Sequence, residues 1–438
     1  MKKVIALFLA LVMMTGLVAC GGKSESGDNN SAKSAQSSQS SEKKANENEQ
    51  VTISWGIYET DNLTADKWDA VISSFEADNP NIKIKKVVAV GDSRPNFWMT
   101  MAASGTFPDI VTEAEQLVVY EPSIFAEVPA DIQDLFEPGA IATYGGKVVT
   151  VPYMKQLRMQ CYYNKADFEA YGLSEPKTFD EFLNICKTLK DAGKIPLICG
   201  GTGDVWATGE PWWISVTNQS ILKKYPNFIK QINSGELTWT DPVIIETLGV
   251  WKSLIDAGYY HPGCMSWSYS QAAAEFQNGE ASMMIDGSWA AAGFDAAGNE
   301  NFGVFVIPSP DGADGYCCPV SYWGVSAKSQ QEEAAWTFIK WFFTNKEAYG
   351  LLLKADGLNS TTKDPVTYEQ GPVMTKFVKN LEGLELYPEI VKAVGDNSLP
   401  GGIENALCKA MQMIFTGMDI TEAMQSVQNE QEMAMNEK

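Results

Sequence analysis

The chain has 438 residues, 45% of them hydrophobic, which is enough apolar material for a sizeable folded core. Its formal net charge of −22 disfavours nucleic acids and anionic membrane surfaces as partners. His261 is the only histidine, so an H-E-x-x-H metal site is impossible, and the chain has no G-x-S-x-G motif for this histidine to serve. We therefore expect no metal and no other cofactor.

The N-terminus has the pattern of an export signal over residues 1–19, with Lys2 and Lys3 followed by an apolar stretch. That stretch of roughly 15 residues is shorter than the ~20 that a transmembrane helix needs. Residues 17–22, LVACGG, resemble a bacterial lipobox. This resemblance implies cleavage before Cys20 and lipidation of its thiol, so we expect a lipid-anchored protein on the extracellular face of a cell membrane.

Residues 20–50 then form a predicted tether, because Ser, Asn, Gln, Lys and Glu dominate and few apolar side chains are available to pack. Removing Lys2 and Lys3 with the signal leaves 31 of the 33 basic residues against 55 acidic ones, a net charge of −24. The remaining chain, from residue 51 to 438, is long enough for two domains.

Seven cysteines follow Cys20, and they show no C-x-x-C spacing. An exported protein would usually pair its cysteines, but seven is an odd number. Most lie in apolar surroundings, where a thiol behaves as a small buried hydrophobic group. We predict that none is a nucleophile or a metal ligand. The seven are Cys161, Cys186, Cys199, Cys264, Cys317, Cys318 and Cys408.

The folded part begins with a predicted strand (51–55), a helix (64–79) and a second strand (82–87), the pattern of a parallel α/β sheet. Polar residues follow the first strand and a third one at 107–111, which places Glu59 and Glu113 at strand ends. Further strands are predicted at 148–153 and 157–163. Further helices are predicted at 97–104, 242–257, 331–344, 373–380 and 403–415. Three more helices should begin at Asn164, at Thr178 and at residue 421, and Glu181 stands at capping-box spacing from Thr178.

Residues 200–213, GGTGDVWATGEPWW, are predicted to form a loop rich in glycine and tryptophan. The loop does not match a phosphate-binding motif, because no Lys-Ser/Thr pair follows and G-x-G-x-x-G is absent. Its three indoles, Trp206, Trp212 and Trp213, could offer flat stacking surfaces to a ligand. Alternatively, they could fill an apolar space between this loop and a helix. The sequence leaves both interpretations open.

Residues 278–294, NGEASMMIDGSWAAAGF, carry the clearest indication of a ligand site. A helix over 268–277 should end at Asn278-Gly279, and a short buried strand should follow over 281–285. Asp286 and Trp289 come directly after this strand, where open α/β sheets bind ligands. Indole and carboxylate together suit a sugar, and Gly287 should let the loop turn sharply. The alternative is that Trp289 fills a domain core.

An enzymatic interpretation survives only for a glycosidase, because two carboxylates are sufficient for that chemistry. Asp286 could form such a pair with Glu113 or Glu59. Nothing in the sequence indicates a raised pKa for any of them, and carboxylates bind sugar hydroxyls equally well. We therefore expect a binding protein, not an enzyme.

Several stretches in their order along the chain resemble the extracellular solute-binding proteins of ABC importers, the family 1 proteins that include maltose-binding protein. None is specific alone, but together they span nearly the whole folded part. They are FEADNPNIK (75–83), PDIV (108–111), YGGK (144–147), VPY (151–153), YYNK (162–165), PKTFDEF (176–182), GEASMMIDGSW (279–289), YWGVS (322–326) and AAWTFIK (334–340).

The resemblance implies an α/β, two-lobe periplasmic-binding-protein-like fold of the class II type, with hinge-linked lobes and an interlobe cleft. Lobe 1 would comprise residues 51–152 and 325–380, and lobe 2 residues 153–324 and 381–438. The implied function is capture of a carbohydrate, an oligosaccharide in particular, by a monomer that delivers it to ABC transporter permease subunits. A surface sugar sensor or adhesin on the same fold is the alternative.

The resemblance also implies a set of ligand-binding residues in loops after strands, with aromatic rings for stacking and charged groups for hydrogen bonds. They are Tyr58, Glu59, Glu113, Arg158, Trp212, Trp267, Asp286, Trp289, Tyr322 and Trp323. Some relatives carry an additional stacking aromatic in the C-terminal part. Residues 401–410 contain none here, which leaves the contribution of that part open.

Overall fold

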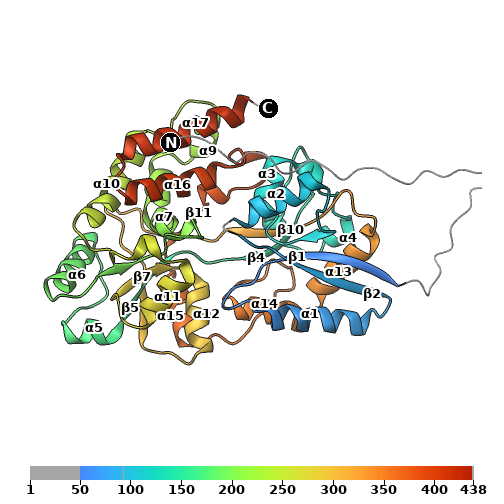
Figure 1. Cartoon of the computed structure of the whole chain (residues 1–438), viewed down its shortest axis with the longest axis horizontal. Coiled ribbons are helices and arrows are strands. Elements are labelled where there is room, and N and C mark those ends of the chain that lie inside the picture. Colours follow the sequence, from blue (N-terminus) through green and yellow to red (C-terminus); the bar gives the residue numbers. More distant parts are fainter. Residues whose placement is uncertain (1–49, 92, 437–438) are drawn as a thin grey trace, which may run out of the picture. The chain divides into compact units, whose positions relative to one another are not determined.

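The computed structural model describes residues 50–91 and 93–436 (Figure 1). The predicted export signal, Cys20 and nearly all of the predicted tether lie outside these residues. Within the described part, no helix combines the length and the apolar composition that crossing a membrane requires.

One sheet has five strands in the order β2-β1-β3-β10-β4, and we call the part of the fold around it lobe 1. Strand β1 pairs in parallel with β2 and β3, whereas β10 is antiparallel to both β3 and β4. The predicted strand–helix–strand start is confirmed, with α1 between β1 and β2. The bounds are β1 Val51–Ile57, α1 Ala65–Asp78, β2 Ile82–Val88, β3 Ile110–Val111, β4 Val151–Lys155 and β10 Val320–Val325.

Both faces of this sheet are covered by helices, so lobe 1 has two cores. On one face, α1, α13 and α14 enclose an aromatic cluster that includes Trp55 and Trp323. On the other face, α2 and α3 pack over Val111 and Tyr322. Figure 1 shows these two helical layers on either side of β1 and β10. The bounds are α2 Arg94–Ser104, α3 Glu115–Tyr120, α13 Glu332–Thr344 and α14 Lys346–Ala355.

A second sheet has four strands in the order β6-β7-β5-β8, and we call its part of the fold lobe 2. Its strands are β5 Gln160–Asn164, β6 Leu197–Ile198, β7 Met283–Asp286 and β8 Phe302–Phe305. The helices on one face are α6 Phe179–Asp191, α8 Asn218–Lys224, α10 Pro242–Asp256, α16 Ile403–Phe415 and α17 Ile420–Asn436. Those on the other are α11 Tyr269–Gln277, α12 Ser288–Ala296 and α15 Pro372–Lys379.

The shorter elements complete the described chain. They are α4 Ala130–Gln133, α5 Lys165–Ala170, α9 Phe228–Asn233 and the pair β9 Gly315–Cys317 and β11 Glu385–Tyr387. Predicted helix starts are confirmed where a side chain caps the helix: Asn164 accepts from Ala166 and Asp167, and Thr178 accepts from Glu181. The seven described cysteines are free and six of them are buried, as their apolar surroundings predicted.

Helix α15 lies in lobe 2, although residues up to 380 were assigned to lobe 1 from the sequence. Its apolar face, Val373, Met374 and Phe377, packs in the same core as Phe294 and Phe302. An amphipathic helix shows from its sequence which face it buries, but not which of two sheets covers that face. The described chain therefore crosses between the lobes after β4, before β10 and between α14 and α15.

The glycine- and tryptophan-rich stretch at 200–213 is only partly a loop, which corrects the sequence prediction. Helix α7 (Trp206–Trp212) begins within it and continues through one π-helical segment (Trp213–Thr217) into α8. Pro211 lies inside α7, where it cannot donate a backbone hydrogen bond. Burial of Trp212 and Trp213 in the lobe 2 core stabilises this irregular helix despite its glycine and proline.

Candidate functional site

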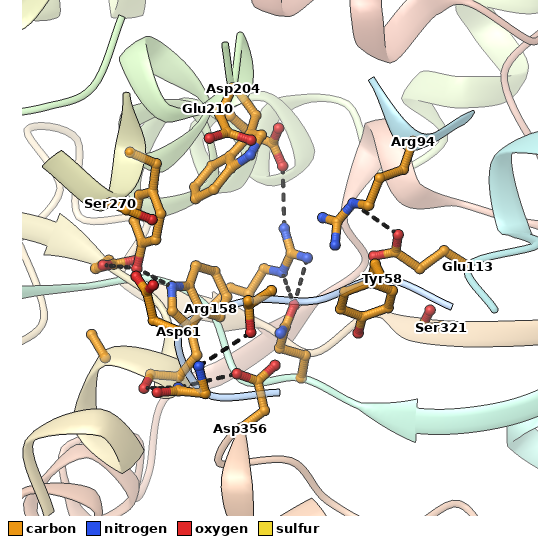
Figure 2. A pocket seen from close by; sticks show the side chains of 18 of the residues that line it. Tyr58, Asp61, Arg94, Glu113, Arg158, Asp204, Glu210, Ser270, Ser321 and Asp356 are labelled. Carbon is orange, nitrogen blue, oxygen red and sulfur yellow. Dashed lines mark hydrogen bonds and ion pairs between the residues drawn. The ribbon is translucent and has the colours of Figure 1, made fainter. Parts of the chain in front are cut away.

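A cavity of about 570 Å³ is lined by residues of both lobes, within the size range of small-molecule sites. Lobe 1 contributes the loop after β1, the start of α2 and the loop after β3. Lobe 2 contributes residues from the β4–β5 connection, α7, α11, α12 and α16. Figure 2 shows its charged side chains converging on the same space.

One end of the cavity is aromatic, formed by Trp206, Tyr269 and Trp289, and we call it the aromatic end. The rings of Trp206 and Trp289 meet edge to face with centroids 6.0 Å apart, and Trp206 and Tyr269 lie 4.9 Å apart. All three side chains are partly exposed rather than buried. Partly exposed rings facing a cavity can stack on the apolar face of a ligand.

Trp289 reaches this position because Gly287 offers no side chain in its way. Gly287 has φ −89° and ψ −174°, an ordinary extended backbone that ends β7 and precedes α12. A Cβ at Gly287 would lie 2.1 Å from the indole of Trp289, so any side chain there would displace the ring. The glycine is needed for close packing, not for the sharp turn that the sequence suggested.

Asp286 is connected to this ring through Tyr269 and is only 2% exposed. One carboxylate oxygen accepts from the Tyr269 hydroxyl at 2.8 Å and the other from the Gly287 N–H at 2.9 Å. The Trp289 Nε1–H donates to the same Tyr269 oxygen at 2.7 Å. Burial raises the pKa of Asp286 to about 7. This relay from Trp289 through Tyr269 to Asp286 orients the indole.

The wall contributed by lobe 1 centres on Arg94. Its Nε lies 3.0 Å from a carboxylate oxygen of Glu113, and its guanidinium lies over the Tyr58 ring at 4.3 Å (Figure 2). Glu113 lies two residues after the end of β3 and has φ 55°, a left-handed conformation that is uncommon outside glycine. Such a conformation points to a residue held in place by its surroundings.

Asn62 joins the two lobes at the aromatic end. Its side-chain N–H group donates to the Trp289 carbonyl at 2.8 Å and to Asp356 at 3.1 Å. Asp356 follows α14 in lobe 1, lines the cavity and has its pKa raised to about 6 by burial. The backbone of Trp289 is therefore fixed to lobe 1 while its ring faces the cavity.

A charged region of the lining adjoins the aromatic end, since the guanidinium of Arg158 lies 5.5 Å from the centre of the Trp289 ring. We call its residues Glu115, Arg158, Glu210, Lys392 and Glu404 the charged end. Arg158 approaches Glu210 at 3.1 Å and donates to Gln156 from both Nε and Nη2. Lys392 and Gln116 both donate to Glu404. Because Glu404, Asn405 and Cys408 of α16 line the cavity, the C-terminal part contributes to the site with polar groups rather than an aromatic ring.

Six of the ten predicted ligand residues line the cavity: Tyr58, Glu59, Glu113, Arg158, Asp286 and Trp289. The other four lie outside it. Trp212 is buried in the lobe 2 core near Phe179, and the ring of Trp267 packs on His261 at 4.5 Å.

Tyr322 and Trp323 are excluded because they lie in the middle of strand β10. The Tyr322 hydroxyl donates to the Ala140 carbonyl in one core, and Trp323 packs on Phe342 at 4.6 Å in the other. Successive side chains of a strand point to opposite faces, so both are turned into cores. It is the preceding Ser321 that lines the cavity.

The sequence interpretation missed several lining residues, including Arg94, Tyr269, Asp356 and Glu404. For Trp206, one of the three indoles of 200–213, it had left a stacking role open, and this indole lines the cavity. One signal was available for Arg94: the chain contains only two arginines, Arg94 and Arg158, and both line this cavity. Nothing comparable distinguished Tyr269 or Asp356. Among the described residues, no group of His, Cys, Asp or Glu could hold a metal ion.

Comparison with known proteins shows which molecules share this organisation. Residues 60–349 match the family model of the bacterial extracellular solute-binding proteins. An uncharacterized ABC transporter extracellular-binding protein of Pyrococcus horikoshii is 24% identical over 83% of each chain. A multiple sugar-binding protein of Streptococcus mutans is 26% identical over 63% of this chain and 67% of its own length.

The fold has a similar counterpart among solved structures. A chitin oligosaccharide binding protein superposes with a TM-score of 0.75 at 23% sequence identity, over 88% of this chain and 99% of that protein. At this identity the similarity shows that the two-lobe α/β fold is shared.

Proposed function

Because the chain belongs to the bacterial extracellular solute-binding protein family, we propose that it captures an oligosaccharide between its two lobes. It delivers this saccharide to the permease subunits of an ABC transporter. The family places the protein in the extracellular or periplasmic space. Two similar proteins, a multiple sugar-binding protein and a chitin oligosaccharide binding protein, support a saccharide as the ligand.

The observation that carries this proposal is the composition of the cavity. Partly exposed aromatic rings at one end face carboxylates, amides and guanidinium groups along the rest of the lining. A pyranose has an apolar face that stacks on a ring and hydroxyls that both donate and accept hydrogen bonds. Trp289 offers the stacking surface, with Arg158 lying over the same ring at 5.5 Å.

Ligand capture is coupled to lobe closure, because residues of both lobes line the cavity. A ligand favours the closed state only through contacts that it makes with both lobes. Lobe 1 comprises about residues 51–155 and 320–355, the second segment running from β10 to the end of α14. Lobe 2 comprises most of the remaining described residues. Closure about the three crossing segments is then a hinge motion.

We propose binding without catalysis. The carboxylates considered for glycoside hydrolysis all have other partners here. Asp286 is 2% exposed and bonded to Tyr269, Glu113 is paired with Arg94, and Glu59 lies 3.6 Å from the Lys86 ammonium. These contacts give each carboxylate a structural or ligand-binding role that requires no catalysis. We also propose a monomer held at the cell surface through a lipid on Cys20.

A screen of neutral mono- and oligosaccharides by thermal shift, followed by calorimetric titration, tests the ligand class. A cognate saccharide should raise the melting temperature, and the rise should grow with the logarithm of its concentration once that exceeds the dissociation constant. If no saccharide in a broad panel stabilises the protein, carbohydrate binding is wrong. Cys20→Ala tests the anchor separately: the variant should leave the membrane fraction while keeping its fold.

A further inference from the structure

Two free cysteines of lobe 2, Cys199 and Cys264, are in direct contact. The backbone N–H of Cys199 donates to the Sγ atom of Cys264 at 3.3 Å, and the Cys199 thiol donates to the same sulfur. Cys199 is 7% exposed and Cys264 is 0% exposed, and both belong to the core on the α11 side of the lobe 2 sheet. The two thiols are therefore held together inside a packed core.

Backbone hydrogen bonds fix the two chain segments that carry this pair, on both sides of it. On one side, the Leu197 N–H donates to the Tyr259 carbonyl at 2.9 Å. On the other side, the Gly201 N–H donates to the Trp267 carbonyl at 2.8 Å. The contact between the cysteines thus belongs to a paired stretch of backbone and not to a chance approach of two side chains.

Two glycines allow these segments to approach each other closely. A Cβ at Gly200 would lie 2.9 Å from the Cα of Tyr269. A Cβ at Gly201 would lie 2.6 Å from the Cα of Met265. Because a disulfide joins residues whose Cα atoms are only about 4.4–6.8 Å apart, a close approach of the two backbones is what such a bond requires.

We propose that Cys199 and Cys264 form a disulfide when the protein folds in an oxidising environment, as exported proteins usually do. The bond joins the segment that leads into Trp206 to the segment that leads into Tyr269, two rings of the aromatic end whose centroids are 4.9 Å apart. It therefore staples the chain segments that supply these rings. The role is structural and goes beyond the proposed function, since neither thiol acts on a ligand.

Exchange with a small disulfide, such as glutathione disulfide, supplies the oxidant. The Cys264 thiolate, its proton lost to solvent, attacks one sulfur of the small disulfide, so a mixed disulfide forms and one small thiolate leaves. Cys199 passes its proton to that thiolate and attacks the Cys264 sulfur, and the second small thiolate leaves and takes a proton from solvent. Two protein thiols are oxidised, and one small disulfide is reduced to two thiols.

The surroundings of the pair favour this order of steps. The hydrogen bond from the Cys199 thiol lowers the pKa of Cys264, which favours its thiolate, while burial raises the pKa of Cys199 and keeps it the donor. Both thiols are buried in the folded protein, so exchange is fastest while the chain is still folding and a small disulfide has access to them.

Other buried thiols of lobe 2 have different surroundings. Cys317 accepts from the Asn218 side-chain amide at 3.4 Å. Cys408 donates to a Glu210 carboxylate oxygen at 3.4 Å. Cys186 lies on α6, where burial raises its pKa and so disfavours the reactive thiolate. Cys186 therefore serves as a matched control for the pair.

Peptide mapping tests whether the bond forms. The protein is unfolded and reduced, refolded in a mixture of reduced glutathione and glutathione disulfide, unfolded again and alkylated before digestion. We expect a cross-linked peptide that joins Cys199 to Cys264, with the other five of the seven described cysteines alkylated. Alkylation of all seven, or a cross-link between other cysteines in place of this one, would overturn the proposal.

Melting curves test the stapling role. The oxidised protein should melt about 2–5 °C above the reduced protein, because the bond restricts the unfolded chain between the two residues. Cys199→Ala and Cys264→Ala should each abolish both the cross-link and this difference, whereas Cys186→Ala should retain both.

A cross-linked protein that melts at the temperature of the reduced protein would overturn the stapling role. A difference that survives Cys199→Ala would assign the effect to other thiols and would also overturn it. The comparison of oxidised with reduced wild-type protein decides the question even where an alanine variant does not fold. No ligand enters these measurements, so their failure leaves the proposed function intact.

Discussion

Two aromatic clusters of this protein use the same residue types for different purposes. In the lobe 1 core, Trp323 is 0% exposed, packs between Trp55 and Phe342, and its Nε1–H has no partner among the described residues. At the aromatic end of the cavity, Trp289 is partly exposed and its Nε1–H donates to Tyr269.

The difference shows what makes an indole available to a ligand. The side chain of the core tryptophan is held by packing alone, and its entire surface is used in that packing. The cavity tryptophan is held at its edge by a hydrogen bond to Tyr269 and through its backbone by Asn62, which leaves part of the ring free. Substitutions in the two clusters should therefore affect different measurements.

The largest effect should come from Trp323→Ala. Removing a fully buried indole should lower the free energy of unfolding by about 3–5 kcal/mol, because the cavity left behind cannot collapse completely. Chemical denaturation of the ligand-free protein measures this loss. A variant with wild-type stability would show that Trp323 does not belong to a tightly packed core.

Trp289→Ala should weaken saccharide binding by about 1–3 kcal/mol, or roughly 5- to 150-fold, through loss of the stacked ring. The ligand-free melting temperature should change little, since the ring is only partly buried. Trp267→Ala is the matched control, because this tryptophan packs on His261 outside the cavity. Unchanged affinity with a collapsed melting temperature would assign Trp289 to the core after all.

Tyr269→Phe should have a smaller effect, of about 1 kcal/mol in binding free energy, because the ring stays while the relay is cut. Both the Asp286 carboxylate and the Trp289 N–H then lose their shared partner. Titration calorimetry with the cognate saccharide measures the loss. Affinity equal to that of the wild type would mean that packing alone positions the indole.

A further difference between the two clusters should be a pH dependence of ligand-free stability that arises at the cavity and not in the lobe 1 aromatic core. Burial raises the pKa of Asp286 from its usual value near 4 to about 7. Between these values the folded state binds more protons than the unfolded state, so stability falls as pH rises from 4 to 7. Asp286→Asn should reduce this slope in melting curves, whereas Trp323→Ala should leave the slope unchanged.

Local features of the sequence determined much of the fold. The strand–helix–strand start, the caps at Asn164 and Thr178, and the helix that ends at Asn278 before β7 were all predictable. These features depend on hydrogen bonds and apolar periodicity within a few residues of one another. The same local pattern placed Asp286 and Trp289 at the end of a strand, where the cavity lies.

Only the tertiary structure decided which aromatic rings face a ligand. Trp212, Tyr322 and Trp323 looked as suitable as Trp289, but partners distant in sequence turn them into cores. The position of Trp289 likewise depends on Asn62, 227 residues away, and the charged end forms only where α16 meets the β4–β5 connection. A sequence shows which residues can pack or bind, but the choice between the two depends on long-range contacts that form only when the lobes are assembled.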